Sequence, residues 1–454
     1  MSSQTLFKER MSNNQIGTFL LCPDCSGGSD DIMNIEISGG LIYEIINADV
    51  DWRKLESGTK IILPPVTEII AGSKIDLKGE KPRIWVEGQQ QVQQQQHRPP
   101  RKILITGSSG YVGQYLLAAL AFEGINSTTD DSTYELFLAY NNLPTFEGDL
   151  NDLLEQQKLH PSVVKIQPIP NVDFSKSDYI QTIQQAIDGT NLDAIVHLAA
   201  LSSPAYCENH PADAWKVNCP ISLLSFHAPI IYLSTDQVYE GTKSYYQEDD
   251  ETFPVNVYGR TKLAFERVLL GRKKSLLSER EMASDGQYMP DMESIPPPNP
   301  KSTILRSSLI LGGPTPLKNG CRKGSFPSFL QFIESRLQGA TPTDYFTNEF
   351  RSVVYIEDVL RAIRHFLNKA LTKENSQVGL YNLGGSTRVS RYEIAVQLAK
   401  HLNLDYSSAN GVERKSGGVP SPPDISMIVD KIATEMGITK MDGLDEIIKH
   451  TFSV

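Results

Sequence analysis

The stretch that decides the fold runs from Lys102 to Gly113 and reads KILITGSSGYVG. Ile103, Leu104 and Ile105 are apolar and predict a buried strand, and apolar side chains from Val112 onward recur at helical spacing. Three glycines separate the two elements in the pattern G-x-x-G-x-x-G. Glycine lets a backbone turn tightly and approach a pyrophosphate, whose charge a helix N-terminus favours. The stretch therefore predicts a strand, turn and helix that bind a dinucleotide.

The same alternation continues along the chain. Apolar runs at 135–140, 163–169, 193–200 and 230–233 predict further strands separated by helical or loop segments. This order defines a doubly wound parallel sheet of the Rossmann type, an α/β fold. Ligands of such sheets bind beyond the carboxyl ends of the strands. We expect 106–113, 199–203 and 234–236 to converge on one crevice.

The second predicted strand bears on the choice of cofactor. It ends in Tyr140-Asn141-Asn142, without the carboxylate that accepts a hydrogen bond from the ribose of NAD. The 2′-phosphate of NADP is not repelled there, although no arginine is present to receive it. NADP is therefore favoured over NAD. Asp173 is expected near the adenine end, and His197 is interpreted as a packed strand residue rather than a catalyst.

Candidate catalytic residues follow the strand at 230–233. Ser234 and Thr235 stand at its end, and Tyr258 and Lys262 are four residues apart, on one face of a predicted helix. A hydroxyl, a phenol and an ammonium group so arranged suit proton transfer to a carbonyl oxygen. An adjacent lysine cation is expected to lower the pKa of the tyrosine by favouring the phenolate.

Bulk composition excludes several classes of protein. The 454 residues hold 43 Lys and Arg against 54 Asp and Glu, a net charge of −11 that argues against nucleic-acid binding. No apolar run approaches the roughly 20 residues of a membrane span. The polar N-terminus predicts no signal peptide, and five cysteines form no disulfide framework, so a cytoplasmic location is expected.

The chain before Arg101 is predicted to be a separate unit. Short β-like runs between Gly and Pro predict a small β-rich unit over 1–88, of unknown role. The Gln/Pro-rich segment 89–100 has too little apolar content to pack and is predicted to be a linker. Cys22 and Cys25 form a C-x-x-C pair, half of the ligand set of a structural zinc site. Two ordinary thiols are the alternative interpretation.

The C-terminal part departs from the alternating pattern after Leu311. Arg351 lies near a predicted strand, where it is either a ligand of a nucleotide diphosphate or an exposed loop residue. Asp358 is interpreted as a helix-start residue, and Ser390 with Glu393 has the spacing of a capping box. The Ser, Gly and Pro-rich segment 406–423 is expected to loop over the site.

Taken together, the motifs resemble the extended short-chain dehydrogenase/reductase family from Arg101 to Val454, and nothing before Arg101 is covered. Within that family, the sequences around Ser234 and Tyr258 are similar to dTDP-4-dehydrorhamnose reductases (RmlD-like) and to the regulatory β subunit of methionine adenosyltransferase. The matching segments are Thr106–Gly113, His197–Ala200, Ser234–Gly241, Tyr258–Lys262 and Tyr381–Gly385.

The resemblance implies a domain over 101–454. Its NADP-binding core would comprise about 101–311 and 352–404, and its substrate lobe about 312–351 and 405–454. It implies a catalytic trio of Thr235, Tyr258 and Lys262 and no metal. The implied cofactor-binding residues are Gly107, Ser109, Gly110, Tyr111, Val112, Gly113, Asp173, Leu198, Ala199, Ala200, Tyr258 and Lys262. The implied substrate-binding residues are Ser203, Thr235, Asn256 and Arg351.

Three functions remain open from the sequence. The first is NADPH-dependent reduction of a nucleotide-activated 4-keto sugar, with the tyrosine as proton donor. The second is a non-catalytic, NADP-binding regulatory subunit of methionine adenosyltransferase, with the catalytic subunit as its partner. The third is a nucleotide-sugar epimerase; a homodimer is compatible with all three. A dehydratase is disfavoured because Gln237 stands where that activity needs a glutamate, and an amide cannot take up a proton.

Two intervals depart from the family pattern. The segment from Asn218 to Ser234 is shorter than the usual helix-and-strand crossover and leaves space for about two helical turns. Either the helix there is clipped, or the sequence has lost a segment. Residues 272–301 carry a polar, Pro-rich insertion that predicts a surface loop.

Overall fold

The computed structural model describes residues 99–125, 133–272, 286–288, 296–319, 328–372, 378–415 and 417–452, and the strands within 1–98. The chain divides into two compact units, Met1–Arg98 and Pro99–Val454. Each is described by itself. No helix among the described residues is both long and apolar enough to cross a membrane.

Short strands make up what is described of the first unit, as the sequence predicts. β1 pairs with β4 and β3 with β5, while β6 lies between β2 and β7. All of these pairs are antiparallel. The strands are β1 Gly17–Leu20, β2 Ile32–Asn34, β3 Ile42–Tyr43, β4 Lys60–Leu63, β5 Pro65–Thr67, β6 Ser73–Asp76 and β7 Arg83–Val86. Cys22, Cys25 and residues 89–98 lie outside the described residues, so the zinc and linker hypotheses stay predictions.

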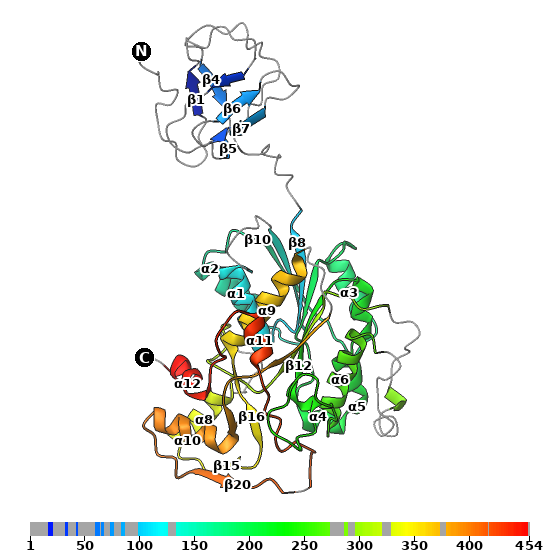
Figure 1. Cartoon of the computed structure of the whole chain (residues 1–454), viewed down its shortest axis with the longest axis vertical. Coiled ribbons are helices and arrows are strands. Elements are labelled where there is room, and N and C mark those ends of the chain that lie inside the picture. The colour runs from blue at the N-terminus through cyan, green and yellow to red at the C-terminus, as the bar shows by residue number, and fades with distance from the viewer. Residues whose placement is uncertain are drawn as a thin grey trace. The chain divides into compact units, whose positions relative to one another are not determined.

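A seven-stranded parallel sheet forms the centre of the second unit, which confirms the predicted α/β fold (Figure 1). The strand order is β10-β9-β8-β11-β12-β13-β18. The order reverses between β8 and β11, which is the point where doubly wound sheets bind their ligands. The strands are β8 Arg101–Thr106, β9 Tyr134–Ala139, β10 Val163–Ile169, β11 Ala194–His197, β12 Ile230–Thr235, β13 Thr303–Ser307 and β18 Gly379–Leu383.

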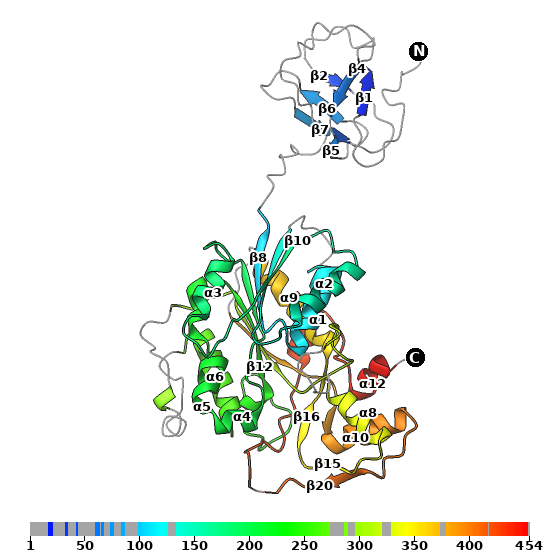
Figure 2. The same ribbon diagram turned by 180° about the vertical axis from the view of Figure 1, so that it is seen from behind.

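Helices cover both faces of this sheet, and each face has its own apolar core. α1 and α9 pack on one face through Leu116, Leu120 and Ile363. α3, α5 and α6 pack on the other, where Trp215 and Phe265 are buried (Figure 2). The helices of the two layers are α1 Tyr111–Glu123, α2 Phe146–Gln156, α3 Tyr179–Ala186, α4 Pro204–Asn209, α5 Pro211–Asn218, α6 Val257–Leu269, α9 Ile356–Leu371 and α11 Asp430–Glu435.

In the structure, the short crossover before β12 contains a 3₁₀ helix. α5 ends at Asn218, and the chain then forms the 3₁₀ helix η2, Ile221–Phe226, before β12 begins at Ile230. A 3₁₀ helix has about three residues per turn, so six residues make about two turns. Leu223 and Leu224 of η2 are buried in the core beside Trp215. The short helix therefore still contributes apolar side chains to this core.

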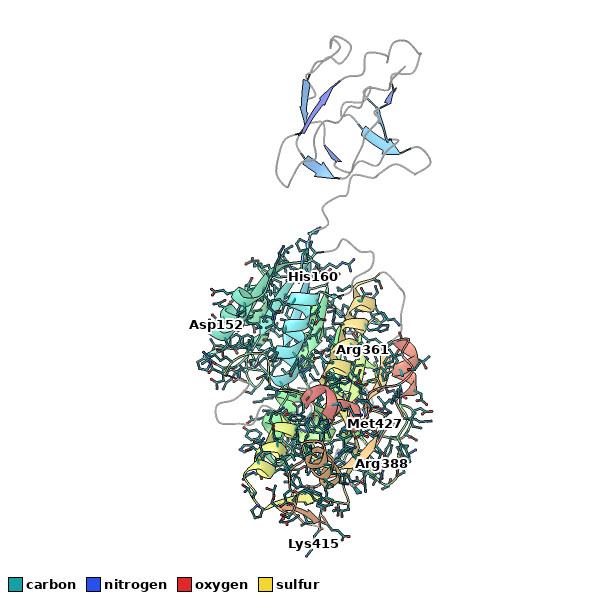
Figure 3. All side chains as sticks on the ribbon, turned by 90° about the vertical axis from the view of Figure 1, so that its left-hand side faces the viewer. Asp152, His160, Arg361, Arg388, Lys415 and Met427 are labelled. Atoms are coloured by element: carbon teal, nitrogen blue, oxygen red, sulfur yellow. The ribbon has the colours of Figure 1, made fainter. Side chains whose placement is uncertain are left out.

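A smaller lobe stands at the carboxyl end of the sheet. Its core contains Leu330, Ile333, Leu398 and Ile447. Lys415, labelled in Figure 3, marks the end of the lobe farthest from His160. Elements outside the main sheet are η3 Asp236–Val238, η5 Gly286–Tyr288, β14 Ile310–Leu311, α8 Phe329–Gln338, β15 Thr343–Phe346, β16 Phe350–Ser352, β17 Val354–Tyr355, β19 Arg388–Ser390, α10 Arg391–His401, β20 Ala409–Val412 and α12 Leu444–Phe452.

Two helices lie in layers other than those the sequence assigned. α10 packs against α8, α12 and β15 in the lobe, although 352–404 was assigned to the core. α11 packs on β18 of the main sheet, although 405–454 was assigned to the lobe. Two local predictions hold: Ser390 and Glu393 form a capping box at the start of α10, and Asp358 lies in the first turn of α9. Helical periodicity shows which face is buried but does not name the layer that buries it.

Residues 273–285 and 289–295 lie outside the described part, so the predicted surface loop within 272–301 stays a prediction.

Candidate functional site

The end of β12 and the start of α6 bring the predicted trio together. Asn256 caps α6, and its side-chain oxygen accepts the Gly259 N–H at 2.8 Å. A Cβ at Gly259 would lie 2.2 Å from the carbonyl oxygen of Gln237, so only glycine lets α6 approach η3 this closely. The capped helix therefore begins directly beside the strand end that carries Thr235.

Each member of the trio contacts the opposite element. The Lys262 ammonium donates to the Leu233 carbonyl of β12 at 2.8 Å. Its nitrogen also lies 4.2 Å from the ring centroid of Tyr232. The Thr235 and Tyr258 side chains are hydrogen-bonded to each other. Thr235, Tyr258 and Lys262 are all buried. The predicted side-chain constellation is therefore present, while the catalytic roles stay predictions.

The charge states of the pair differ from the sequence expectation. Burial raises the pKa of Tyr258 well above its usual range, and the hydrogen bond from Thr235 only partly opposes this. Burial also lowers the pKa of Lys262 to about 7. The expected lowering of the phenol pKa by a lysine cation was wrong, because removal from water penalises both charged forms. Tyr258 is held as the neutral phenol at neutral pH.

A cavity of about 1300 Å³ opens beside the trio and extends along the glycine-rich turn. Gly107 has φ +69°, and a Cβ there would lie 2.7 Å from the Ala199 nitrogen. A Cβ at Gly113 would lie 2.3 Å from the Gly107 carbonyl oxygen. Because Gly107 and Gly113 carry no side chains, the backbone packs closely here and the space above the turn stays open. The predicted cofactor residues that line the cavity are Gly107, Gly110, Tyr111, Val112, Gly113, Leu198, Ala200, Tyr258 and Lys262.

Three other predicted cofactor residues lie outside the lining. The Ser109 carbonyl accepts from the Gln114 amide at 2.9 Å. The Asp173 carboxylate accepts from the Ser175 backbone and hydroxyl at 2.9 and 2.7 Å, so it shapes its own loop. Ala199 supplies the backbone against which Gly107 packs. His197 is fully buried, as the packed-residue interpretation predicts.

The predicted substrate residues divide in a similar way. Ser203, Thr235 and Arg351 line the cavity. Asn256 does not: its amide nitrogen donates to the Gln237 side chain at 2.8 Å and to the Pro420 carbonyl at 3.1 Å. Arg351 is a buried residue of β16, which corrects its interpretation as an exposed loop arginine.

A group of charged residues in the lobe was missed by sequence reasoning. Arg391 and Arg414 line the cavity with Arg351, and buried Glu349 lies among them. Glu349 is 3.1 Å from Arg414 and 3.8 Å from Arg391. Arg351 and Arg391 both stabilise the ionised form of buried Asp236, next to Thr235. We call Arg351, Arg391 and Arg414 the arginine cluster.

No local signal distinguishes these arginines from solvent-exposed ones. Arg391 is the first residue after a helix cap, and Arg414 follows a short strand in a Ser/Gly-rich segment. Residues at such positions are usually exposed to solvent. Only the folding of the lobe brings these two arginines to one cavity. Part of the predicted loop 406–423 does face the site, because Val419, Pro420 and Ser421 also line it.

The arrangement combines three chemical capabilities in one cavity. The glycine-rich turn and the N-terminus of α1 suit a pyrophosphate. The neutral Tyr258 phenol beside Thr235 suits proton donation to a carbonyl oxygen. The arginine cluster suits a second anionic group. Within the described part of the chain, no group of three His, Cys, Asp or Glu side chains could hold a metal ion.

The resemblance seen in the motifs is confirmed by a family match that covers part of the chain. Residues 101–280 match the family described as RmlD substrate binding domain.

Relatives from both branches of the resemblance are found. The chain is 23% identical over 323 residues to the methionine adenosyltransferase 2 subunit beta of Bos taurus, covering 70% of this chain and 76% of the relative. It is 26% identical over 231 residues to a dTDP-4-dehydrorhamnose reductase of Sinorhizobium fredii, covering 49% of this chain and 64% of the relative.

Solved structures share the fold. A Bacillus anthracis dTDP-4-dehydrorhamnose reductase in complex with NADP superposes with a TM-score of 0.53 at 17% identity, covering 78% of this chain and 99% of the other. A Bacillus cereus UDP-glucuronic acid 4-epimerase, in complex with UDP-glucuronic acid and NAD, superposes with a TM-score of 0.53 at 20% identity, covering 77% and 97%.

The glycine-rich turn yields the first testable prediction. Gly113→Ala places a methyl group 2.3 Å from a backbone oxygen, so the turn must shift. We expect a loss of about 1–3 kcal/mol in the free energy of unfolding, as for overpacked sites, measured by urea denaturation. The matched control is Gly148→Ala in α2, where a Cβ meets nothing within 4 Å. The control should be neutral or stabilising by up to about 1 kcal/mol. Equal effects of the two substitutions would refute the steric account.

Proposed function

We propose that the protein is an NADPH-dependent reductase of a nucleotide-activated 4-keto sugar. The observation that carries this proposal is one cavity of about 1300 Å³ that joins the glycine-rich turn, the Thr235–Tyr258–Lys262 trio and the arginine cluster. A dinucleotide and a second anionic substrate can then meet at the trio between them. The matched RmlD family and the NADP-complexed structural neighbour support the same reaction class.

The residues of the turn fit the cofactor. Cβ atoms at Gly107 and Gly113 would collide with backbone, so the turn is open only because both are glycine. Gly107, Gly113 and the helix N-terminus would hold the pyrophosphate, and Lys262 would hydrogen-bond the nicotinamide ribose. When bound, NADPH supplies the hydride to the carbonyl carbon of the substrate.

Tyr258 supplies the proton in this proposal. Its raised pKa keeps the phenol protonated at neutral pH, which is the form that a reduction consumes. Thr235 orients the substrate oxygen toward the phenol through its own hydroxyl. Gln237 takes no part in proton transfer, since its amide oxygen accepts from Asn256. This arrangement supports reduction over dehydration.

The arginine cluster would bind the diphosphate of the nucleotide. Three guanidinium groups face two buried carboxylates, Glu349 and Asp236, so the cluster keeps a net positive charge when both acids are ionised. Arginine binds phosphate oxygens in bidentate geometry, and such charge-assisted bonds are about twice as strong as neutral ones.

Tyr258→Phe tests the proton-donor role. Purified protein, NADPH and a dTDP-4-keto-6-deoxy sugar should give cofactor oxidation that the variant loses by about 100-fold or more, as for a general acid. Unchanged NADPH binding by the variant, followed by fluorescence, is the control. Equal rates of cofactor oxidation in the two proteins would reject the catalytic role. Turnover of the sugar without net NADPH oxidation would instead indicate the epimerase alternative.

Arg414→Gln tests the diphosphate site. Losing one charge-assisted contact of about 1.5–3 kcal/mol should raise KM by roughly 10- to 100-fold with a smaller change in kcat. Lys415→Gln is the matched control, because this exposed neighbour does not line the cavity. An equal rise in KM for both variants would show a general charge effect and reject the assignment.

A regulatory subunit of methionine adenosyltransferase is the second candidate function. One observation favours it: the Bos taurus β-subunit relative matches over 70% of this chain, against 49% for the reductase of Sinorhizobium fredii. A binding-only role uses the same cofactor cavity. We expect that role to appear as co-purification with a methionine adenosyltransferase catalytic subunit and no keto-sugar reduction. Reduction without any such complex, measured by gel filtration of the mixed proteins, would exclude it.

A further inference from the structure

A row of buried polar side chains crosses three strands behind the trio. Ser234 of β12 lies opposite Arg306 of β13, and Arg306 lies opposite Asn382 of β18. All three are buried. Tyr239 completes the row, because its hydroxyl accepts from Arg306 at 2.9 Å and donates to Asn382 at 2.7 Å. Apolar side chains usually fill such positions in a parallel sheet.

Glu266 of α6 connects this row to the catalytic helix. Its carboxylate is fully buried and accepts the Ser234 hydroxyl at 2.5 Å. Arg306 binds the same carboxylate, with its Nε atom 3.2 Å from Oε1 and its Nη2 atom 2.8 Å from Oε2. The ion pair is thus bidentate and shielded from water.

Glu266 also extends the face that carries the trio. Tyr258, Lys262 and Glu266 are spaced by four residues along α6, so they share one side of the helix. Their partners on β12 are consecutive: the Leu233 carbonyl, the Ser234 hydroxyl and the Thr235 hydroxyl. The end of β12 is therefore hydrogen-bonded to α6 through three successive residues.

Stability alone does not explain a buried ion pair here. The cost of removing two ions from water often exceeds their attraction, and apolar residues of similar volume serve as well. What the pair does provide is a negative charge one helical turn from Lys262. Such a charge favours the protonated form of the lysine.

The other titratable groups around Lys262 carry no charge that does the same. His197 of β11 has a pKa lowered well below its usual value by burial, so its ring is neutral. Burial raises the pKa of Cys219 to about 12 and that of Tyr232 well above its usual value, so both stay protonated. Tyr258 is neutral for the same reason. Glu266 is the largest influence that raises the pKa of Lys262 against the effect of burial.

We propose that Glu266 is a positioning residue: held by Ser234 and Arg306, it joins the Thr235-bearing strand end to α6 and favours the charged form of the Lys262 side chain in its buried site. This inference rests on the proposed function only for the use of Lys262 toward the cofactor. The charge relation itself concerns the free protein.

Titration of Lys262 in the free protein tests the proposal. The full chain is labelled with [6-¹³C]lysine, and the Lys262 signal is assigned by its absence in Lys262→Met. We expect a wild-type midpoint near the pKa of about 7. Glu266→Gln should lower that midpoint by about one pH unit or more, the size of a nearby opposite charge. Ser234→Ala keeps the carboxylate and should leave the midpoint unchanged.

Two results would overturn the proposal. One is a Glu266→Gln midpoint equal to the wild-type value; the other is an equal fall in Ser234→Ala, which would assign the shift to repacking. If Glu266→Gln does not fold, Glu266→Gln combined with Arg306→Gln also removes the buried guanidinium that would lose its partner, and the Lys262 midpoint should still fall below the wild-type value, by less than in Glu266→Gln alone. No cofactor or sugar enters the measurement, so absent keto-sugar reduction would reject the proposed function without affecting this result.

Discussion

The backbone of Gly107 lies against that of Ala199 where the sheet reverses its strand order. A Cβ at Gly107 would lie 2.7 Å from the Ala199 nitrogen, so the two strand ends meet only because one of them carries glycine. This approach keeps β8 and β11 adjacent at their carboxyl ends and leaves the cavity open above them. Thr235 at the end of the next strand, β12, and Tyr258 and Lys262 of α6 line the same cavity. The site therefore depends on a close contact between two backbones, which is possible only because Gly107 has no side chain.

Burial governs the chemistry at the trio. Tyr258, Lys262 and Asp236 are all removed from water, and each has its pKa moved toward the neutral form. A phenol in this state is a proton donor, whereas a lysine needs a nearby anion to remain charged. The Glu266 carboxylate is placed to provide that anion, and Arg306 and Ser234 hold it there. The geometry and charge of the trio thus depend on Glu266 and Arg306, neither of which lines the cavity.

The smaller lobe supplies the arginine cluster of the cavity. Arg351 comes from β16, Arg391 from the first turn of α10, and Arg414 from the segment after β20. These residues are far apart in the chain and converge only when the lobe packs as one body. The buried carboxylate of Glu349 holds two of them in place while leaving the cluster positive. The lobe therefore places three guanidinium groups in the same cavity that the glycine-rich turn of the sheet lines.

The sequence by itself determined the doubly wound sheet, the glycine-rich turn, the cap of α10 and the alignment of Tyr258 with Lys262. These follow from local geometry: glycine spacing, the periods of strand and helix, and short-range side-chain caps. Only the tertiary structure decided the charge states of the trio, the convergence of the arginine cluster and the packing of α10 in the lobe. It also brought Ser234, Arg306 and Glu266 together. Desolvation and ion pairing depend on every group packed around a side chain, and those groups come from distant parts of the chain.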